Sequence, residues 1–87
     1  MNNLTFSSTA WNEYLYWQNK DKNVLRCINK LLKDIQRDPF NGLGKPEKLK
    51  YCNNSWSRRI DNKNRLVYSI DGNNTIILSC RDYYDDK

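Results

Sequence analysis

Three separate parts of the sequence carry side chains that together suit the cleavage of RNA without a metal ion. Glu47 is the lone acid in the basic run 45–50, and neighbouring cations favour its charged form, which can accept a proton. Arg65 can stabilise negative charge that develops on a phosphate, and Tyr83 and Tyr84 near the C-terminus offer hydroxyl groups. Cleavage beside a ribose needs a base for the 2′-OH, cations around the phosphate and a proton donor for the leaving 5′-oxygen. These residues fit the three roles, although their spacing alone does not prove a site.

Each of these residues also has a simpler interpretation. Glu47 can be a surface partner of the adjacent lysines, and Arg65 an ordinary arginine on a solvated strand. One of the two terminal tyrosines can pack on the core while the other is exposed. From the residue types alone, both interpretations stay open.

The charge of the chain favours an anionic partner. Its 87 residues contain 15 Lys and Arg against 10 Asp and Glu, which gives a net charge of +5. The stretch 44–65 alone carries seven basic and two acidic residues, and the charges of the flanking segments cancel. Basic side chains of this stretch and of the C-terminal end are therefore the candidates for RNA binding: Lys45, Lys48, Lys50, Arg58, Arg59 and Arg81.

Several classes of site are excluded or disfavoured by composition. The absence of histidine removes His-ligated metal sites, His-based triads and His-pair ribonucleases. An odd set of three cysteines without CxxC spacing fits neither a disulfide framework nor a zinc site, so we expect reduced thiols, with Cys27 and Cys80 in the core and Cys52 in a loop. No metal and no cofactor is expected. No run of about 18 apolar residues and no secretion signal is present, which favours a cytoplasmic protein without membrane contact.

The length fits a single domain over residues 1–87, and the N-terminal half predicts a strand followed by two helices. A short strand covers 4–6, and Ser7, Ser8 or Thr9 caps a first, aromatic helix that ends at 19–21. Asp21 caps a second helix, whose apolar residues from Val24 to Ile35 recur with helical spacing. Asp38-Pro39 ends this helix.

The C-terminal half predicts an irregular segment over 40–55 and then three strands over 55–60, 65–70 and 75–81, joined by turns at 61–64 and 71–74. The fold class is therefore α+β, with two N-terminal helices packed on an antiparallel sheet. The helices cover one face, and the other face is partly open and carries basic side chains. The expected core consists of Val24, Ile28, Leu31, Leu32, Ile35, Leu66, Tyr68, Ile70, Ile76 and Leu78.

Strand geometry places Arg65 away from the core. It precedes Leu66, so it lies opposite the face of Leu66 and Tyr68. If Ile60 pairs with Arg65 across the turn, Trp56 and Arg58 share its face, and Arg59 points the other way or lies at an edge. Two arginines beside a tryptophan can grip a phosphate and stack a base.

The order and spacing of several blocks resemble one family almost from end to end. The blocks are WNEYLYW (11–17), GKPEKLK (44–50), WSRRI (56–60), RLVY (65–68), and Cys80-Arg81 with Tyr84 near the end. In this combination they are similar to the YoeB/Txe toxins of the RelE superfamily.

The resemblance implies a microbial-ribonuclease-like α+β fold and a toxin of a bacterial toxin–antitoxin pair that cuts mRNA in the ribosomal A site. It also implies neutralisation by a YefM/Phd-type antitoxin, and often a toxin homodimer. Matched by position, the catalytic glutamate falls on Glu47, the key arginine on Arg65 and the terminal tyrosine on Tyr84, with Arg59 among the residues that hold RNA.

The chain departs from the family pattern near its end. Tyr83 stands where a histidine commonly acts as general acid, Asp82 where an aromatic residue is usual, and Asn64 where histidine usually precedes the arginine. A phenol, with a pKa near 10 against about 6.5 for imidazole, is the weaker proton donor at pH 7. Two alternatives to an active ribonuclease follow: a catalytically weakened toxin that still binds its partners, or an inhibitor like the related ParE toxins, which act on gyrase.

Overall fold

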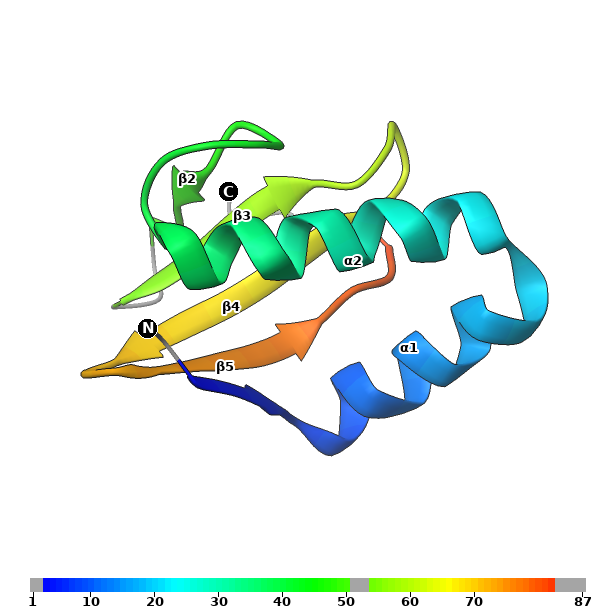
Figure 1. Ribbon diagram of the computed structural model, residues 1–87, viewed down its shortest axis with the longest axis horizontal. Coiled ribbons are helices and arrows are strands. Elements are labelled where there is room, and N and C mark those ends of the chain that lie inside the picture. Colours follow the sequence, from blue (N-terminus) through cyan, green and yellow to red (C-terminus); the bar gives the residue numbers. More distant parts are fainter. Residues whose placement is uncertain (1–2, 51–53, 83–87) are drawn as a thin grey trace.

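The computed structural model describes residues 3–50 and 54–82, which form two helices and a five-stranded sheet (Figure 1). In chain order the elements are β1 (Asn3–Phe6), α1 (Ser8–Lys20), α2 (Lys22–Arg37), β2 (Glu47–Lys48), β3 (Ser55–Arg59), β4 (Arg65–Asp71) and β5 (Asn74–Ser79). Both helices lie on the same side of the sheet. The predicted α+β class, with two helices packed on one face of a sheet, is confirmed.

The sheet is mixed rather than purely antiparallel. Its strand order is β1-β5-β4-β3-β2, and the pairs formed by β2 to β5 are antiparallel, as expected for a meander. Strand β1 instead pairs in parallel with β5, because the chain crosses over through both helices before it returns to the sheet. The segment predicted to be irregular contributes the two-residue strand β2 at the other edge.

Side-chain caps fix the ends of the helices where the sequence predicts them. The Ser7 hydroxyl accepts the backbone N–H of Ala10 at 3.0 Å and so caps α1. Asp21 ends α1 and caps α2, since its carboxylate accepts the N–H groups of Asn23 and Val24. Asp38 ends α2 immediately before Pro39. The helices therefore form a tight hairpin whose apolar sides face the sheet.

The core confirms most of the predicted residues and corrects two. Ile28, Leu31, Leu32, Ile35, Leu66 and Tyr68 are buried, while Val24 and Ile70 are half-buried at its margin. Two predictions on β5 are wrong: Leu78 is 37% exposed and Ile76 only half-buried, and the strand contributes Ile77 and Thr75 instead. The run Ile76-Ile77-Leu78 has no polar alternation to set which face turns inward. Pairing with β4, including a bulge between Val67 and Tyr68, sets it by placing Ile77 opposite Tyr68.

Candidate active site and nucleic-acid interface

Glu47, Arg59 and Arg65 lie on one face of the sheet, the face that the helices do not cover, here called the helix-free face. Glu47 pairs with Ser57, Ser57 pairs with Val67, and Arg59 stands opposite Arg65. Directly opposed residues, and alternate residues along a strand, share a face. With strands about 4.8 Å apart and a rise of about 3.4 Å per residue, the Cα atoms of Glu47 and Arg65 are about 12 Å apart.

A tight turn delivers Arg65 to the start of β4. The Asp61 carboxylate accepts the backbone N–H groups of Lys63 and Asn64, both at 2.8 Å. Partial burial raises the pKa of Asp61, but these bonds and the Asn64 side chain outweigh that effect and hold the pKa below its ordinary value. The backbone N–H of Arg65 then donates to the carbonyl oxygen of Asp82 at 3.0 Å. The start of β4 and the segment after β5 are thereby joined.

The loop before β2 places Glu47 beside β3. Gly44 adopts a φ of 78°, and its carbonyl oxygen accepts the backbone N–H of Arg59 at 2.7 Å. A Cβ at Gly44 would lie 2.9 Å from the Arg59 carbonyl oxygen, so this close approach requires glycine. The chain then enters β2, where the Glu47 side chain is exposed. Glu47 is therefore accessible to a ligand on the helix-free face.

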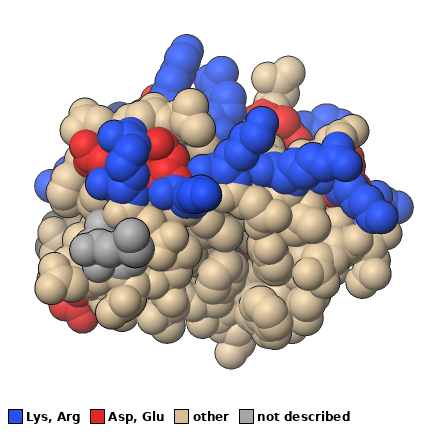
Figure 2. All heavy atoms as spheres, viewed as in Figure 1, with Lys and Arg blue, Asp and Glu red and all other residues tan. Residues whose placement is uncertain are grey.

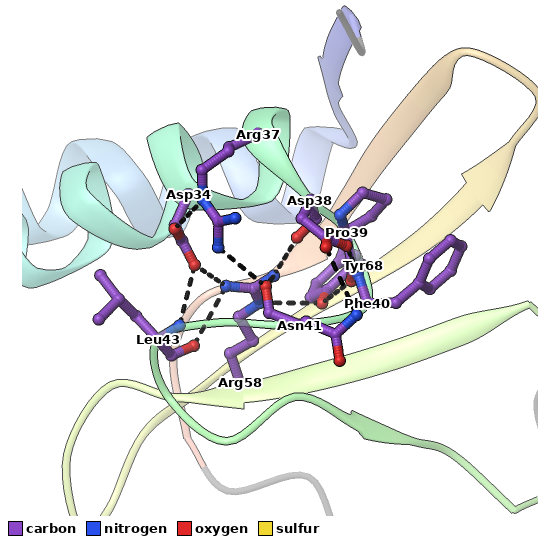
Figure 3. Close-up of polar contacts among 9 residues, drawn as sticks. All are labelled: Asp34, Arg37, Asp38, Pro39, Phe40, Asn41, Leu43, Arg58 and Tyr68. Carbon is purple, nitrogen blue, oxygen red and sulfur yellow. Dashed lines mark hydrogen bonds and ion pairs between the residues drawn. The ribbon is translucent and has the colours of Figure 1, made fainter.

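Arg58, predicted to bind RNA, is instead completely buried beneath α2 (Figure 3). Its guanidinium donates to the Asp34 carboxylate at 2.6 Å, to the carbonyl oxygen of Asp38 at 2.6 Å and to the hydroxyl of Tyr68 at 3.0 Å. It also reaches the carbonyl oxygen of Leu43 at 3.1 Å. All of these partners belong to the protein, so Arg58 fastens the loop after α2 rather than facing a ligand.

The Asp34 carboxylate is the anionic centre of this network. Hydrogen bonds from the Arg37 side chain, from the Leu43 backbone N–H at 2.8 Å and from Arg58 hold its pKa well below the usual range. Burial raises the pKa of the Tyr68 phenol, whose hydroxyl donates to the Pro39 carbonyl oxygen at 2.7 Å. The network ties the end of α2 and the following loop to β3 and β4, and so supports the loop that leads to Glu47.

The predicted register between β3 and β4 was wrong by one residue. Arg59, not Ile60, pairs with Arg65, because the turn spans five residues between paired positions. Trp56 and Arg58 consequently lie on the helix-covered face, where Trp56 packs against Phe40 with ring centroids 5.1 Å apart. Arg59, predicted to point the other way or to lie at an edge, is the partner of Arg65 on the helix-free face.

The other predicted cations are exposed but do not all face the same way. Lys45, Lys48 and Lys50 are exposed along the segment around β2. Lys48 pairs with Trp56, which assigns it to the opposite side from Glu47. Arg81 is exposed, and its guanidinium lies 3.9 Å from the centre of the Tyr16 ring on α1.

Two of the predicted catalytic residues, Tyr83 and Tyr84, lie outside the described residues, as does Cys52. The described part of the chain ends at Asp82, which bonds to the backbone of Arg65. Among residues 3–50 and 54–82 no group of three or more His, Cys, Asp or Glu side chains could hold a metal ion. Within the same ranges, no helix has the length and apolar character to cross a membrane.

A second basic surface, on α2, was not predicted from the sequence. Five exposed cations follow one another at intervals of three or four residues, and Asp34 is the only acid on the helix. Figure 2 shows the band of Lys and Arg that they contribute to on the side of the molecule that carries the helices. The spacing is visible in the sequence, but it is also the ordinary pattern of a solvated helix face. The residues of this α2 ridge are Lys22, Arg26, Lys30, Lys33 and Arg37.

Comparison with known proteins gives a consistent result. Residues 6–84 match a family described as a YoeB-like toxin of bacterial type II toxin–antitoxin systems. The chain is 46% identical to Toxin YoeB of Escherichia coli K12 over 82 residues, which is 93% of this chain and 98% of that protein. It resembles the YoeB dimer from Staphylococcus aureus with a TM-score of 0.88 and 45% identity, over 95% of this chain and 98% of that one. It resembles the YoeB–YefM complex from the same organism with a TM-score of 0.84 and 45% identity, over 97% of this chain and 99% of that one.

Proposed function

The chain belongs to the YoeB-like toxin family of bacterial type II toxin–antitoxin systems, and from this premise we propose that it is a ribosome-dependent endoribonuclease. It cuts mRNA in the ribosomal A site and so inhibits translation. The observation that carries the proposal is the position of Glu47 and Arg65 on one face of the sheet, with Arg59 between them. An acid–base group and two cations on a shared face supply two of the three functions that metal-free RNA cleavage requires, the base and the cations around the phosphate.

In the proposed reaction the RNA itself supplies the nucleophile. Glu47 accepts the proton of the 2′-OH, and the 2′-oxygen attacks the adjacent phosphorus as the bond to the 5′-oxygen breaks. The guanidinium groups of Arg65 and Arg59 stabilise the negative charge on the phosphate oxygens in the transition state. A 2′,3′-cyclic phosphate is left on one fragment, and the departing 5′-oxygen takes a proton. No metal or cofactor takes part in these steps.

Tyr83 or Tyr84 is the proposed donor of that last proton. Support comes from the bond between Arg65 and Asp82, because it holds the residue immediately before Tyr83 in the sequence at the start of β4. A phenol is a weaker acid than imidazole, so the same observation supports the alternative of a toxin with weakened catalysis. Replacing Tyr83 by histidine separates the two. If the toxin is weakened, the Tyr83→His variant cuts faster than wild type. If Tyr83 is a competent acid, Tyr83→Phe loses activity and Tyr83→His gains none.

The α2 ridge supports binding to a particle rich in RNA. Its cations are on the side of the molecule opposite Glu47, so the protein can contact one RNA while another lies on the helix-free face. We further propose a cytoplasmic protein held inactive by a YefM-type antitoxin and able to form a homodimer. This rests on the relatives from Staphylococcus aureus, solved as a YoeB–YefM complex and as a YoeB dimer.

The direct test is cleavage of mRNA on programmed ribosomes. Glu47→Gln removes the proton acceptor and keeps the size of the side chain, so the rate should fall about 10²- to 10⁴-fold. Asp71→Asn is the matched control, because it neutralises an exposed acid at the other end of β4. A Glu47→Gln variant as fast as Asp71→Asn would contradict the assignment of Glu47. Ribosome binding without any cleavage by the wild type would favour the non-catalytic alternative.

A further inference from the structure

The side chain of Asn64 links the turn before Arg65 to the segment after β5. Its Oδ1 accepts the backbone N–H of Asp82 at 2.7 Å. One position further along, the Arg65 backbone N–H donates to the carbonyl oxygen of the same Asp82 at 3.0 Å. Both backbone polar groups of Asp82 are therefore bound at the start of β4, and one of the two bonds depends on a side chain.

The orientation of the Asn64 amide is fixed from its other end. Its Nδ2 donates to both carboxylate oxygens of Asp61, at 3.1 and 3.2 Å. Because a carboxylate only accepts, the amide nitrogen must face Asp61 and the amide oxygen must face Asp82. Asn64 is only 9% exposed, so water competes poorly for these bonds. A short side chain with one donor end and one acceptor end is what this position needs.

The two residues before Asp82 are held independently by α1. The Cys80 backbone N–H donates to the Glu13 carboxylate at 2.9 Å, and its carbonyl oxygen accepts the Trp17 indole N–H at 2.9 Å. Arg81 stacks on Tyr16. The chain is thus fixed on the helix side through Arg81, and Asn64 is the side chain that fixes the next residue on the side of the sheet that carries Arg65.

Asp82 also has a backbone conformation that makes such a contact important. Its φ of 68° lies in the left-handed region, which Asp and Asn enter at lower cost than most residues but which still disfavours a non-glycine chain. The hydrogen bond from its N–H to Asn64 offsets part of this cost and holds the chain in the turn.

We propose that Asn64 is a positioning residue that holds Asp82 against the start of β4 and so fixes the backbone from which the Arg65 side chain extends. The catalytic consequence rests on the proposed function, whereas the clamp itself does not. At position 64, as at position 83, the chain differs from the residue that is usual in the family. Asn64 thus acts on the reaction through Arg65.

The clamp is tested in the free protein by hydrogen exchange of the Asp82 amide. Asn64→Ala should speed this exchange at least about tenfold, because the amide loses its acceptor. Asn74→Ala is the matched control, since it removes one hydrogen bond, from the Thr5 hydroxyl at 3.0 Å, at the opposite end of β4. It should leave Asp82 exchange unchanged. Equal exchange at Asp82 in Asn64→Ala and in the wild type would overturn the clamp.

The catalytic role is tested by single-turnover cleavage and ribosome affinity in the same variants. Asn64→Ala should cut about 10- to 100-fold more slowly than Asn74→Ala, because small misplacements of reacting groups are costly, while affinity changes less than about threefold. The double variant Asp61→Asn/Asn64→Asp moves the amide donor to position 61 and keeps an acceptor for the Asp82 N–H at position 64, so it should restore both the rate and the protection of Asp82. A merely structural role would slow cleavage only as far as the folded fraction falls, which urea unfolding of both alanine variants measures.

The outcomes keep this inference separate from the proposed function. If Asp82 exchange responds but cleavage falls no more than in Asn74→Ala, the positioning role is wrong and the ribonuclease assignment stands. If the wild type cuts no RNA, the proposed function fails and, with it, the catalytic part of the inference. The exchange measurement then still decides whether Asn64 holds Asp82 at the start of β4.

Discussion

Arg59 and Arg65 stand directly opposite each other on β3 and β4, with both side chains on the helix-free face. Two like charges in directly opposed positions repel each other. A phosphate placed between them would remove that repulsion and accept hydrogen bonds from both guanidinium groups. The pairing therefore supports the proposed phosphate contact of the two arginines, which lie on the same face as Glu47.

Replacing Arg65 should affect the chemical step more than binding. In Arg65→Ala the guanidinium that meets the developing phosphate charge is removed, and we expect cleavage to slow about 10²- to 10³-fold. Ribosome affinity should fall much less, because Arg59 and the lysines around β2 remain. Single-turnover rates and equilibrium binding to programmed ribosomes measure the two effects. Equal losses in rate and in affinity would reduce Arg65 to a simple phosphate contact.

Arg58 and Arg59 are neighbours in sequence with opposite predicted consequences. Arg58→Met leaves the Asp34 carboxylate and several carbonyl groups without their buried partner, and should lower the free energy of unfolding by about 3–5 kcal/mol. Arg59→Met changes an exposed side chain and should alter the free energy of unfolding by less than about 0.5 kcal/mol. Urea unfolding of both variants gives the comparison. Similar stabilities would show that the network around Arg58 contributes little.

This pair also illustrates what the sequence could and could not predict. The helix bounds followed from capping residues and from the apolar spacing of α2, which are local features. The faces of β3 and β5 could not be predicted, because a change of one residue in the turn moves every side chain of a strand to the other face of the sheet. Nothing in the local sequence shows that Arg58 meets Asp34, since the contact forms only when α2 packs across β3. For the same reason Glu47 and Arg65 could be singled out by type, but Asn64 could not be recognised as the contact to Asp82.

The depressed pKa of Asp34 predicts a specific pH dependence of stability. A carboxyl group whose pKa is lower in the folded than in the unfolded protein stabilises the fold above its unfolded pKa of about 3.9, and this contribution is lost as the pH falls further. Asp34→Asn should therefore be markedly less stable than wild type at pH 7, with a gap that narrows below about pH 4. Urea unfolding at pH 7 and pH 3 measures the gap, with Asp71→Asn as control. A gap of the same size at both pH values would contradict this role for Asp34.

The α2 ridge should contribute to binding through charge alone. In Lys30→Gln/Lys33→Gln, ribosome affinity should fall and its dependence on salt should flatten by about 0.7–0.9 in the double-logarithmic slope for each phosphate that is no longer neutralised. Lys30→Arg/Lys33→Arg keeps the charges and should behave like wild type. Sedimentation binding at several salt concentrations gives the slopes. Unchanged ribosome affinity, together with weaker binding of the antitoxin, would assign the ridge to a protein partner.

The most direct measurement of the central claim uses wild-type protein and ribosomes programmed with two matched mRNAs. One mRNA is all ribose, and the other carries a single 2′-deoxy nucleotide at the position of the cut in the A-site codon. If Glu47 activates the 2′-OH, the first mRNA is cut within that codon and leaves a 2′,3′-cyclic phosphate, while the second stays intact at that bond. Cleavage of the 2′-deoxy mRNA at the same bond, or no cleavage of either mRNA, would contradict this mechanism.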